Sequence, residues 1–497
     1  MRHPERLVVI AVDGLRRDVF ERTLAAGELP NVARIVGGRE AETACRVDAL
    51  STAPSITFAA QASIFTGQHP GAHGIAGNES FDRLGRISGG RPRHFGFDVG
   101  YTLAVDDAVR VFTDGLASRF LSEETPTLYE MAAAHGLSSA VAHHMVARGA
   151  GAWLPPDIVD IARFTKGKGI LGLEAGAYDR GMLDRLVGYL DAGNRLDVLT
   201  AYFMGLDHHS HVHGPASQPG YLRDVVDPQI GRLLDALQAH GMLEGALFGL
   251  VSDHGQIEVI PDDRHSIRLG FPFDRELGYL FEALGLDVHD VPGEDPACDA
   301  VVGLNGGQAH VYLQNRAGRW ADPPRYAEDV LPVAEAFLQM NETGRYEDEL
   351  QGSLDLILVR DAEHEGWQGE YRAYLGDGQT LPLPGYLAAR PELDYADAVN
   401  RIRLAAGSCT GDLILLANGR EGYYFGAPTT GVHGGLYPEE SEVVLTFACP
   451  SGSPGEVAWL RETVAGVVAD RCANEGNRQP SVADFVPAAL ALLGLGV

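Results

Sequence analysis

Acidic and imidazole side chains stand at separated points of the chain in settings that suit metal binding. They are Asp13 at the end of VVIAVDG, Asp207 and His211 in GLDHHSHVHGP, Asp253 and His254 in VSDHG, and His433 in GVHGG. A hydroxyl, Thr57, and an amide, Asn78, lie in SITFAAQASIFTGQHPGAHGIAGN. Carboxylates and imidazoles are common zinc ligands, with a water or substrate oxygen completing each coordination shell. The three aspartates, three histidines and one threonine are therefore enough for two metal centres.

Each motif has a simpler interpretation when it is taken alone. Asp13 could cap a helix, and Asp207 and His211, four residues apart, could form a surface ion pair. Asp253 and His254 are more distinctive, because they follow an apolar run and precede a glycine that permits a sharp turn. Together, the motifs predict two metal ions about 4 Å apart, which would hold the attacking and leaving oxygens of an in-line displacement.

The elements that must position these residues indicate an α/β fold. Apolar runs rich in Val, Ile and Leu recur between helix-like segments, which is typical of a mostly parallel sheet covered on both faces. The predicted strands are Leu7–Val12, Ser139–Ala142, Asp197–Met204, Ala246–Val251 and Glu442–Phe447. The predicted helices are Thr127–His135, Tyr221–His240 and a buried C-terminal helix that follows a capping box of Ser481 and Asp484. Ligands bind beyond the carboxyl ends of such strands, so we expect the strand-end aspartates to meet there.

The stretch from residue 260 to residue 409 has a different texture. Two short β-like pieces, Ala309–Leu313 and Leu354–Val359, lie among many Gly, Pro and charged residues. Because the motif VSDHG precedes this stretch and GVHGG follows it, we interpret it as an insertion. We expect a catalytic domain formed by residues 1–259 and 410–497, with an inserted α+β cap domain at 260–409.

The motifs resemble those of the alkaline phosphatase superfamily, and most closely its type I phosphodiesterase/nucleotide pyrophosphatase branch. The segment TFAAQASIFTGQHPGAHGI is similar to the nucleophile region of that family, in which a threonine opens a helix. DHHSHVHGP, SDHG and the late HGG are similar to its metal-binding motifs. The resemblance covers roughly residues 5–260 and 410–497. It implies an alkaline-phosphatase-like central sheet, mostly parallel and flanked by helices.

The resemblance also implies a role for each motif residue. One Zn²⁺ would be held by Asp207, His211 and His433, and a second by Asp13, Asp253 and His254, with Thr57 bound to the second ion as the nucleophile. Asn78 would contact a phosphate oxygen, and Phe58 would pack on a nucleobase. Mn²⁺ or Fe can occupy similar sites of nitrogen and oxygen ligands, so the resemblance predicts two metal ions more firmly than their identity.

The chain departs from the family pattern directly after Phe58. The family commonly has Pro, then Asn or Ala, then His, whereas Ala59, Ala60 and Gln61 stand here. A second departure is in GVHGG, where a glycine replaces the aromatic or polar residue that is frequent after HG. These departures leave the metal ligands intact and affect the expected preference for the leaving group.

The activity expected from the resemblance is hydrolysis of a phosphodiester or nucleotide pyrophosphate through a phosphothreonine intermediate. An alternative on the same two-metal site is a phosphate monoesterase or phosphonate hydrolase, which would need extra cations such as Lys166, Lys168 or Arg180. A non-catalytic protein that binds a phosphate ligand is a third possibility, but it predicts lost ligands and all expected ligands are present.

Two other classes of enzyme do not fit the motifs. A sulfatase of this superfamily needs Cys or Ser where Thr57 stands. A haloacid-dehalogenase-like phosphatase needs a second acid two residues after its nucleophile, whereas Asp13 is followed by Gly14 and Leu15.

The composition restricts the partners. The chain has 497 residues, with 39 Lys and Arg against 68 Asp and Glu, a formal net charge of −29. Such acidity opposes nucleic-acid polymers and anionic membranes as partners, so we expect a small phosphate ester as substrate. The sequence leaves the oligomeric state open.

We expect a cytoplasmic location. The N-terminus lacks the pattern of a signal peptide, and no apolar stretch approaches the roughly 20 residues that span a bilayer. Five scattered cysteines without a CxxC motif indicate reduced, mostly buried thiols.

Overall fold

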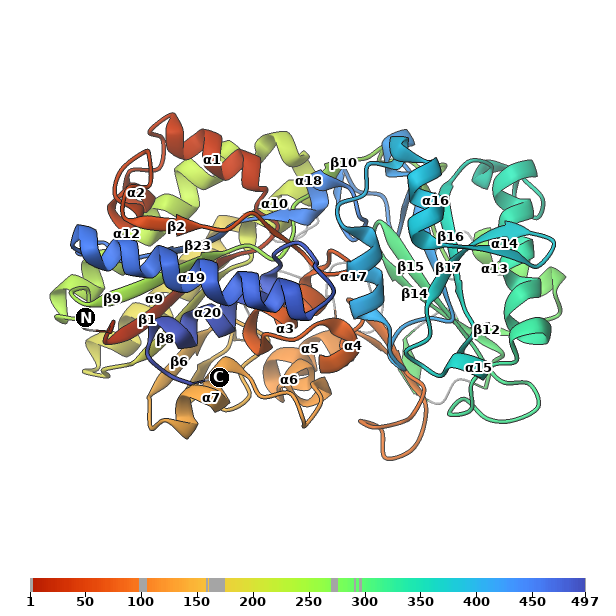
Figure 1. Ribbon diagram of the computed structural model, residues 1–497, viewed down its shortest axis with the longest axis horizontal. Helices are drawn as coiled ribbons and strands as arrows, with labels where there is room; N and C mark the ends of the chain where they lie inside the picture. Colours follow the sequence, from red (N-terminus) through yellow and green to blue (C-terminus); the bar gives the residue numbers. More distant parts are fainter. Residues whose placement is uncertain are drawn as a thin grey trace.

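The computed structural model describes residues 3–97, 105–157, 160, 175–269, 276–289, 292–294 and 297–496. Two lobes lie side by side along the long axis (Figure 1). Each lobe is built on a sheet with seven strands in the described chain. Both chain ends lie in the lobe that contains β1, at the left of Figure 1. This lobe carries the predicted metal ligands, and the second lobe is formed mainly by the middle of the sequence.

The first sheet has the strand order β2-β23-β9-β1-β8-β6-β7. Its strands are β1 (Arg6–Val12), β2 (Ala44–Arg46), β6 (Ser139–Ala142), β7 (Ala152–Leu154), β8 (Val198–Phe203), β9 (Ala246–Val251) and β23 (Leu445–Ala448). β1 runs parallel to β8 and β9, and β6 runs parallel to β7 and β8, whereas β23 pairs antiparallel with β9 and β2. The predicted mostly parallel sheet is confirmed, as are four of its five predicted strands within a residue at either end.

The fifth predicted strand, Glu442–Phe447, is divided between two sheets. β22 (Glu442–Val443) pairs with β3 (Ala49–Leu50), and only β23 joins the main sheet. The two pieces meet at Val444. The backbone N–H of Val444 donates to the hydroxyl of Ser252, and the carbonyl of Val444 accepts from the backbone N–H of Ser252. An apolar run alone cannot reveal this division, because both pieces are β-structure.

Helices cover both faces of the first sheet, so its central strand is apolar throughout. In β1, Leu7, Val9 and Ala11 pack on one face, and Val8, Ile10 and Val12 pack on the other. The first face is covered by α3 (Thr57–Thr66), α7 (Leu128–Ala134), α19 (Pro454–Asn474) and α20 (Phe485–Leu492). The second face is covered by α1 (Arg17–Ala25), α2 (Pro30–Val36), α9 (Ala175–Asp191) and α12 (Asp227–Ala239).

The predicted helices differ in how well they match. Thr127–His135 is confirmed as α7, which begins with a capping box of Thr127 and Glu130. The C-terminal helix is confirmed as the buried α20. Tyr221–His240 is instead a π-helical turn over Leu222–Val226 followed by α12. Pro228 supplies the reason, because it has no N–H to donate to the preceding turn.

The second sheet has the order β12-β14-β15-β19-β16-β17-β18. Its strands are β12 (Val288–His289), β14 (Ala300–Asn305), β15 (Gln308–Leu313), β16 (Leu354–Arg360), β17 (Tyr371–Gly376), β18 (Gln379–Pro382) and β19 (Leu413–Ala417). The predicted boundary at residue 410, where the chain was expected to return to the catalytic domain, differs from where the second sheet ends. β19 follows that boundary but is hydrogen-bonded between β15 and β16 of the second sheet. One face packs on α13 (Glu276–Ala283) and α14 (Leu331–Thr343), and the other on α16 (Leu383–Ala389) and α17 (Ala398–Ala405).

Further short strands and helices lie outside the two main sheets. The short strands are β4 (Glu79–Asp82), β5 (Arg93–Gly96), β10 (Ile257–Glu258), β11 (Ser266–Ile267), β13 (Gly293–Glu294), β20 (Tyr424–Phe425) and β21 (Gly431–Val432). The short helices include α4 (Pro70–His73), α5 (Val105–Thr113), α6 (Leu116–Phe120), α10 (Gly205–His213), α11 (Gln218–Tyr221), α15 (Ala362–Glu365) and α18 (Pro438–Ser441). A buried ion pair reinforces the junction, since the guanidinium of Arg83 donates two hydrogen bonds to Asp412.

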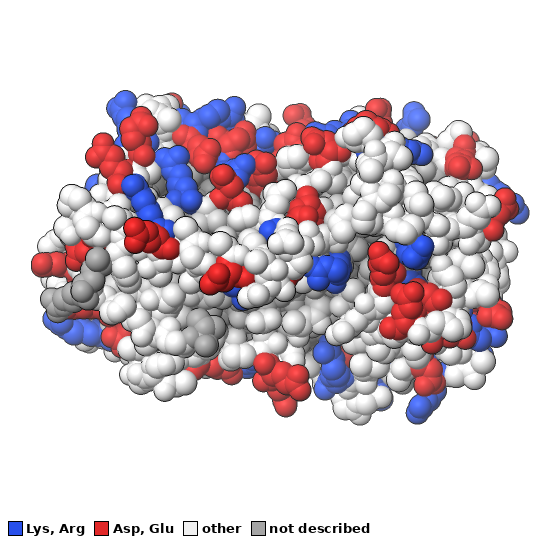
Figure 2. Space-filling model, viewed as in Figure 1, with Lys and Arg blue, Asp and Glu red and all other residues white. Residues whose placement is uncertain are grey.

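The surface agrees with the acidic composition. Acidic side chains are spread over both lobes in Figure 2, and the basic side chains on this face are scattered among them. All five cysteines are free thiols; Cys409 is buried and the other four are half-buried. Among the described helices, none is long and apolar enough to cross a membrane.

Candidate two-metal active site

The carboxyl ends of three neighbouring strands bring the predicted aspartates together. Asp13 directly follows β1 and donates its backbone N–H to Phe203 at the end of β8. Asp207 lies in the first turn of α10, and Asp253 lies two residues after β9. Gly14 permits the close approach of these loops, because its φ is +68° and a Cβ there would lie 2.6 Å from Asp207 Oδ1.

One group of ligands contains Asp13, Asp253 and His254. His254 Nε2 lies 3.3 Å from Asp13 Oδ1 and 3.5 Å from Asp253 Oδ2. Thr57 Oγ1, at the first residue of α3, lies 3.1 Å from the same nitrogen. This group matches one of the two predicted ligand sets together with the predicted nucleophile.

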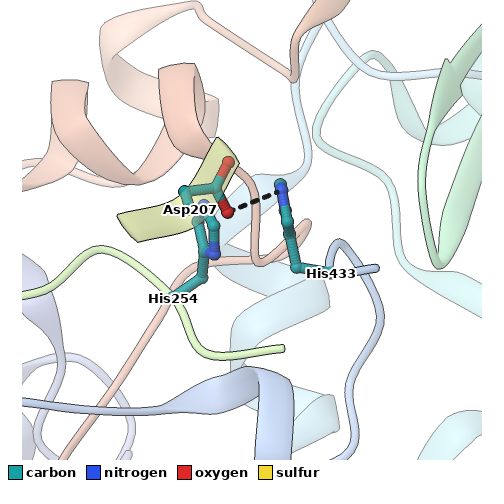
Figure 3. A group of neighbouring side chains, drawn as sticks. All are labelled: Asp207, His254 and His433. Carbon is teal, nitrogen blue, oxygen red and sulfur yellow. Dashed lines mark ion pairs between the residues drawn. The ribbon is translucent and has the colours of Figure 1, made fainter. Parts of the chain in front are cut away.

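The second group adjoins the first. His211 Nε2 is 3.1 Å from Asp207 Oδ2, and His433 Nε2 is 3.7 Å from Asp207 Oδ1. The Nε2 atoms of His211 and His433 are 3.2 Å apart. Figure 3 shows Asp207 and the ring of His433 turned toward each other, with His254 beside them. The rings of His254 and His433 stack with centroids 3.6 Å apart, so the two groups form one continuous cluster.

Each of the three histidines presents Nε2 to this cluster. The Nδ1–H groups of His211, His254 and His433 donate to backbone carbonyls, namely those of Gly431 at 2.7 Å, Gly255 at 2.9 Å and Ser55 at 3.2 Å. A carbonyl oxygen only accepts, so these bonds fix the proton on Nδ1 and orient each ring. Metal-ligating histidines are held in this way in proteins generally.

A buried carboxylate oxygen provides a further test of metal binding. Asp13 Oδ1 is buried and accepts no hydrogen bond within the described chain, although Asp13 Oδ2 accepts one from Tyr202. Burial raises the pKa of Asp13 well above its usual value, and the neighbouring Asp253 and Asp207 raise it further. A bound cation would compensate for both the missing partner and the repulsion between carboxylates. The residues present therefore fit a metal ion.

The electrostatic field of the carboxylates also acts on His254. Burial lowers the pKa of its imidazole, but Asp253 and Asp13 outweigh this effect and raise the pKa to about 10. Burial and the nearby His254 instead lower the pKa of His433. The position of His254 Nε2 thus favours a positive charge, which a metal ion would provide.

The carboxylates have partners that the motifs did not indicate. Gln61 Nε2 donates to Asp253 Oδ2 at 3.0 Å, and Gln61 Oε1 accepts from His144 Nε2 at 2.9 Å. Gln256 Nε2 donates to Asp207 Oδ1 at 2.5 Å. The helical spacing of four residues between Thr57 and Gln61 was the available signal for the first of these contacts.

The two predicted substrate-binding residues, Asn78 and Phe58, meet at the start of α3, but the aromatic ring points elsewhere. The backbone N–H of Phe58 donates to Asn78 Oδ1 at 3.1 Å. The Phe58 ring is 6% exposed and stacks on Phe97, with centroids 5.2 Å apart, in the core of the first lobe. This placement does not support the predicted packing of Phe58 on a nucleobase.

A pocket opens beside His211 and His433, between the two lobes. Its described walls include Ile56 and Val432 from the first lobe and Leu304 and Phe425 from the second. Asn78, Glu79, Gly306 and Gly426 complete the described lining. Of the cations considered for a monoesterase, Lys166 and Lys168 lie outside the described residues, and Arg180 is an exposed residue of α9.

The hairpin between β14 and β15 positions one of the ligands. The N–H of Gly307 donates to the carbonyl of His433 at 2.8 Å. A Cβ at Gly306 would lie 1.9 Å from the same oxygen, so the turn fits against the ligand loop only as glycine. The second lobe therefore takes part in building the site.

Comparison with known proteins agrees with this geometry. A family model described as type I phosphodiesterase / nucleotide pyrophosphatase matches residues 7–394. The structure of murine ectonucleotide pyrophosphatase / phosphodiesterase 5 is similar, with a TM-score of 0.56 at 14% identity over 99% of this chain and 95% of that chain. The human counterpart has a TM-score of 0.54 at 13% identity, over 99% and 96% of the two chains.

A third similar structure is an inactive murine form of that protein in complex with AMP. Its TM-score is 0.55 at 13% identity, over 99% of this chain and 96% of that chain. No curated protein sequence matches this chain. The neighbours establish an alkaline-phosphatase-like α/β fold, and the family model extends over most of the chain. The protein therefore belongs to the type I phosphodiesterase/nucleotide pyrophosphatase family and is a phosphoric ester hydrolase.

Proposed function

We propose that this phosphodiester hydrolase acts through Thr57 on a small phosphate ester at a two-zinc site. The observation that carries the proposal is the position of Thr57 Oγ1, 3.1 Å from His254 Nε2 in the group that also contains Asp13 and Asp253. A hydroxyl at the first residue of a helix, beside three buried ligands, is placed to attack a bound phosphorus.

Metal ions would be held by the two ligand sets of the cluster. Asp207, His211 and His433 form one set, and Asp13, Asp253 and His254 form the other. Bound Zn²⁺, or Mn²⁺ or Fe in its place, supplies Lewis-acid activation of the threonine hydroxyl and of water.

The chain's own residues carry the covalent steps. Thr57 Oγ forms a bond to phosphorus as the bond between phosphorus and the leaving alkoxide breaks. The proton lost by the threonine hydroxyl is taken up by that alkoxide, which leaves as an alcohol. Water then hydrolyses the phosphothreonine, which releases the phosphate monoester and restores the hydroxyl. The Asn78 side chain and the backbone N–H of Phe58 would hold a non-bridging oxygen, since the two groups meet at the start of α3.

Several features support a diester over a monoester. Among the described residues lining the pocket there is no lysine or arginine, the groups that a second phosphate charge requires. The AMP complex of the similar murine protein supports a nucleotide-like ester.

The composition supports the proposed substrate size and location. The net charge of −29 supports a small substrate over a nucleic-acid polymer or a membrane. The free cysteines support a cytoplasmic location.

The test is hydrolysis of bis-p-nitrophenyl phosphate and of the p-nitrophenyl ester of a nucleotide. We expect turnover that is lost with a chelator, restored by Zn²⁺, and abolished in Thr57→Ala. Thr343→Ala, an exposed threonine on α14, serves as the matched control. Turnover that persists both with chelator and in Thr57→Ala would contradict the proposal.

A further inference from the structure

We infer that Glu79 selects substrates whose ester group beside His211 and His433 carries a positively charged hydrogen-bond donor. This inference rests on the proposed phosphodiesterase function and names the chemistry of one substituent. It concerns the pocket between the lobes, where Glu79 is the carboxylate among the described lining residues.

The backbone holds Glu79 at the rim of the reaction site. Glu79 directly follows Asn78, the residue that accepts from the N–H of Phe58. Its own N–H donates to Asn305 Oδ1 at 3.0 Å, and Asn305 Nδ2 donates back to the carbonyl of Glu79 at 3.3 Å. Asn305 ends β14, so the second lobe fixes the residue next to the predicted phosphate contact.

The two carboxylate oxygens of Glu79 differ in their surroundings. Oε2 accepts from the backbone N–H of Leu304 at 2.9 Å and lies 3.7 Å from His94 Nε2. Oε1 has no hydrogen-bond partner in the described part of the chain, and the side chain is 14% exposed. The carboxylate is thus oriented by one oxygen while the other can accept from a ligand.

The other residues that line the pocket strengthen the effect of the Glu79 charge on a ligand. Ile56, Leu304, Phe425 and Val432 give the pocket an apolar character, and no described lining residue is lysine or arginine. A charge interacts more strongly in such surroundings than in water. A carboxylate or second phosphate on the substituent would be repelled by Glu79, whereas an ammonium group would form a charge-assisted hydrogen bond.

Three p-nitrophenyl phosphodiesters test the inference, because they share one leaving group and differ in charge. Their second alcohols are 2-aminoethanol, 1-propanol and 3-hydroxypropanoic acid. We expect the zinc-loaded enzyme to favour the aminoethyl ester over the propyl ester by at least about 10-fold in kcat/KM, with the carboxyethyl ester the slowest. In Glu79→Gln, which keeps an acceptor for Leu304, these ratios should fall to within about 3-fold.

A control variant and a binding measurement separate the alternatives. Glu244→Gln removes an exposed carboxylate that follows α12, away from the pocket, and tests whether the net charge alone attracts cations. Calorimetry of 2-aminoethyl phosphate and propyl phosphate with zinc-loaded Thr57→Ala, with and without Glu79→Gln, measures the same preference without turnover. If Glu79→Gln does not fold, Glu79→Asp, which withdraws the charge by one methylene, should show a reduced preference.

The inference is overturned if neither assay shows a preference for the ammonium group. It is also overturned if Glu79→Gln retains the preference, or if Glu244→Gln loses it equally. Chelator-sensitive, Thr57-dependent turnover without charge preference would reject the role of Glu79 alone. Turnover independent of Thr57 and of metal would reject the proposed function, while the calorimetry would still decide the role of Glu79.

Discussion

Gln61 donates a side-chain hydrogen bond to Asp253, with 3.0 Å between Nε2 and Oδ2. The amide of Gln61 is itself held in place, because its Oε1 accepts a hydrogen bond from His144 Nε2 at 2.9 Å. The His144 ring is held in turn by its Nδ1, which accepts from the backbone N–H of Val146 at 3.0 Å. Gln61 was a departure from the family sequence pattern, and the structure shows it as a support for a predicted ligand. All three side chains are buried, so the hydrogen bonds are not in competition with water.

The first prediction concerns this support. Gln61→Ala should weaken Zn²⁺ binding by about 10- to 100-fold, because ligand-orienting partners contribute that much to metal affinity. Competition with a chromogenic chelator measures the dissociation constant. Gln68→Ala, an exposed glutamine just beyond the same helix, should bind zinc as the wild type does. Equal affinities in Gln61→Ala and wild type would show that Gln61 does not orient Asp253.

The second prediction concerns the effect of metal on stability. Because Asp13, Asp207 and Asp253 lie close enough to repel one another, a bound ion that relieves this repulsion should stabilise the folded state. Free Zn²⁺ at 100 times its dissociation constant contributes about 2.7 kcal/mol per site to the free energy of unfolding. Thermal denaturation with zinc and with a chelator measures this difference, and Asp253→Ala should show a smaller one. An unchanged midpoint on chelation would contradict metal binding at the cluster.

The third prediction concerns Asp179, which anchors the start of α10. Its Oδ1 accepts from the N–H of Gly205 at 3.0 Å and its Oδ2 accepts from the Tyr221 hydroxyl at 2.8 Å. Burial raises the pKa of Asp179 from its ordinary value to about 7, against the opposing effect of these hydrogen bonds. The folded protein therefore holds this proton more tightly than the unfolded chain.

The sign of the pH effect follows from that difference. The stabilising contribution of protonated Asp179 to the free energy of unfolding is fully present below about pH 4. It is lost as pH rises through about 7, and it amounts to on the order of 4 kcal/mol. Urea denaturation of wild type and Asp179→Asn from pH 5 to pH 8 should show the variant gaining relative stability as pH rises. Asp184→Asn, an exposed acid on the same helix, should follow the wild type. A difference between Asp179→Asn and wild type that is constant with pH would refute the raised pKa.

The sequence predicted those parts of the site that depend on strand ends. Asp13 and Asp253 each follow an apolar strand, and parallel strands place their carboxyl ends at one edge, so their proximity could be expected. The contacts of Gln61 and Gln256 were not predictable in this way, because they depend on helix orientation and on side-chain reach. Phe58 shows the opposite limit. Its position in the motif was clear, but its ring packs on Phe97, which follows β5 and is distant in sequence.

The prediction of where the second lobe ends failed for a similar reason. The apolar run at β19 fits either sheet, and its partners β15 and β16 lie about 50 to 100 residues away in the sequence. Local composition therefore placed the boundary at residue 410, whereas long-range pairing places β19 in the second sheet. Strand pairing of this kind depends on contacts that no single segment specifies.

The fourth prediction concerns the buried ion pair at the junction of the lobes. Asp412 accepts two hydrogen bonds from Arg83 and lies 3.6 Å from a second buried guanidinium, that of Arg360. Asp412→Asn would leave two buried cations without their shared anion, whereas Arg83→Met would leave Asp412 beside Arg360. We expect Asp412→Asn to lower the free energy of unfolding by about 3–5 kcal/mol and Arg83→Met to lower it by less.

Chemical denaturation of the two variants gives the order of the losses, and the Arg83→Met/Asp412→Asn double variant measures their coupling. If Asp412 serves both cations, removing Arg83 from the Asp412→Asn background should restore part of the lost stability, because one unpaired charge is then gone. Losses that simply add would mean that the pair makes no net electrostatic contribution. A larger loss in Arg83→Met than in Asp412→Asn would show that Arg360 does not share the carboxylate, and that its hydrogen bonds to the carbonyls of Gly407 and Thr410 satisfy it instead.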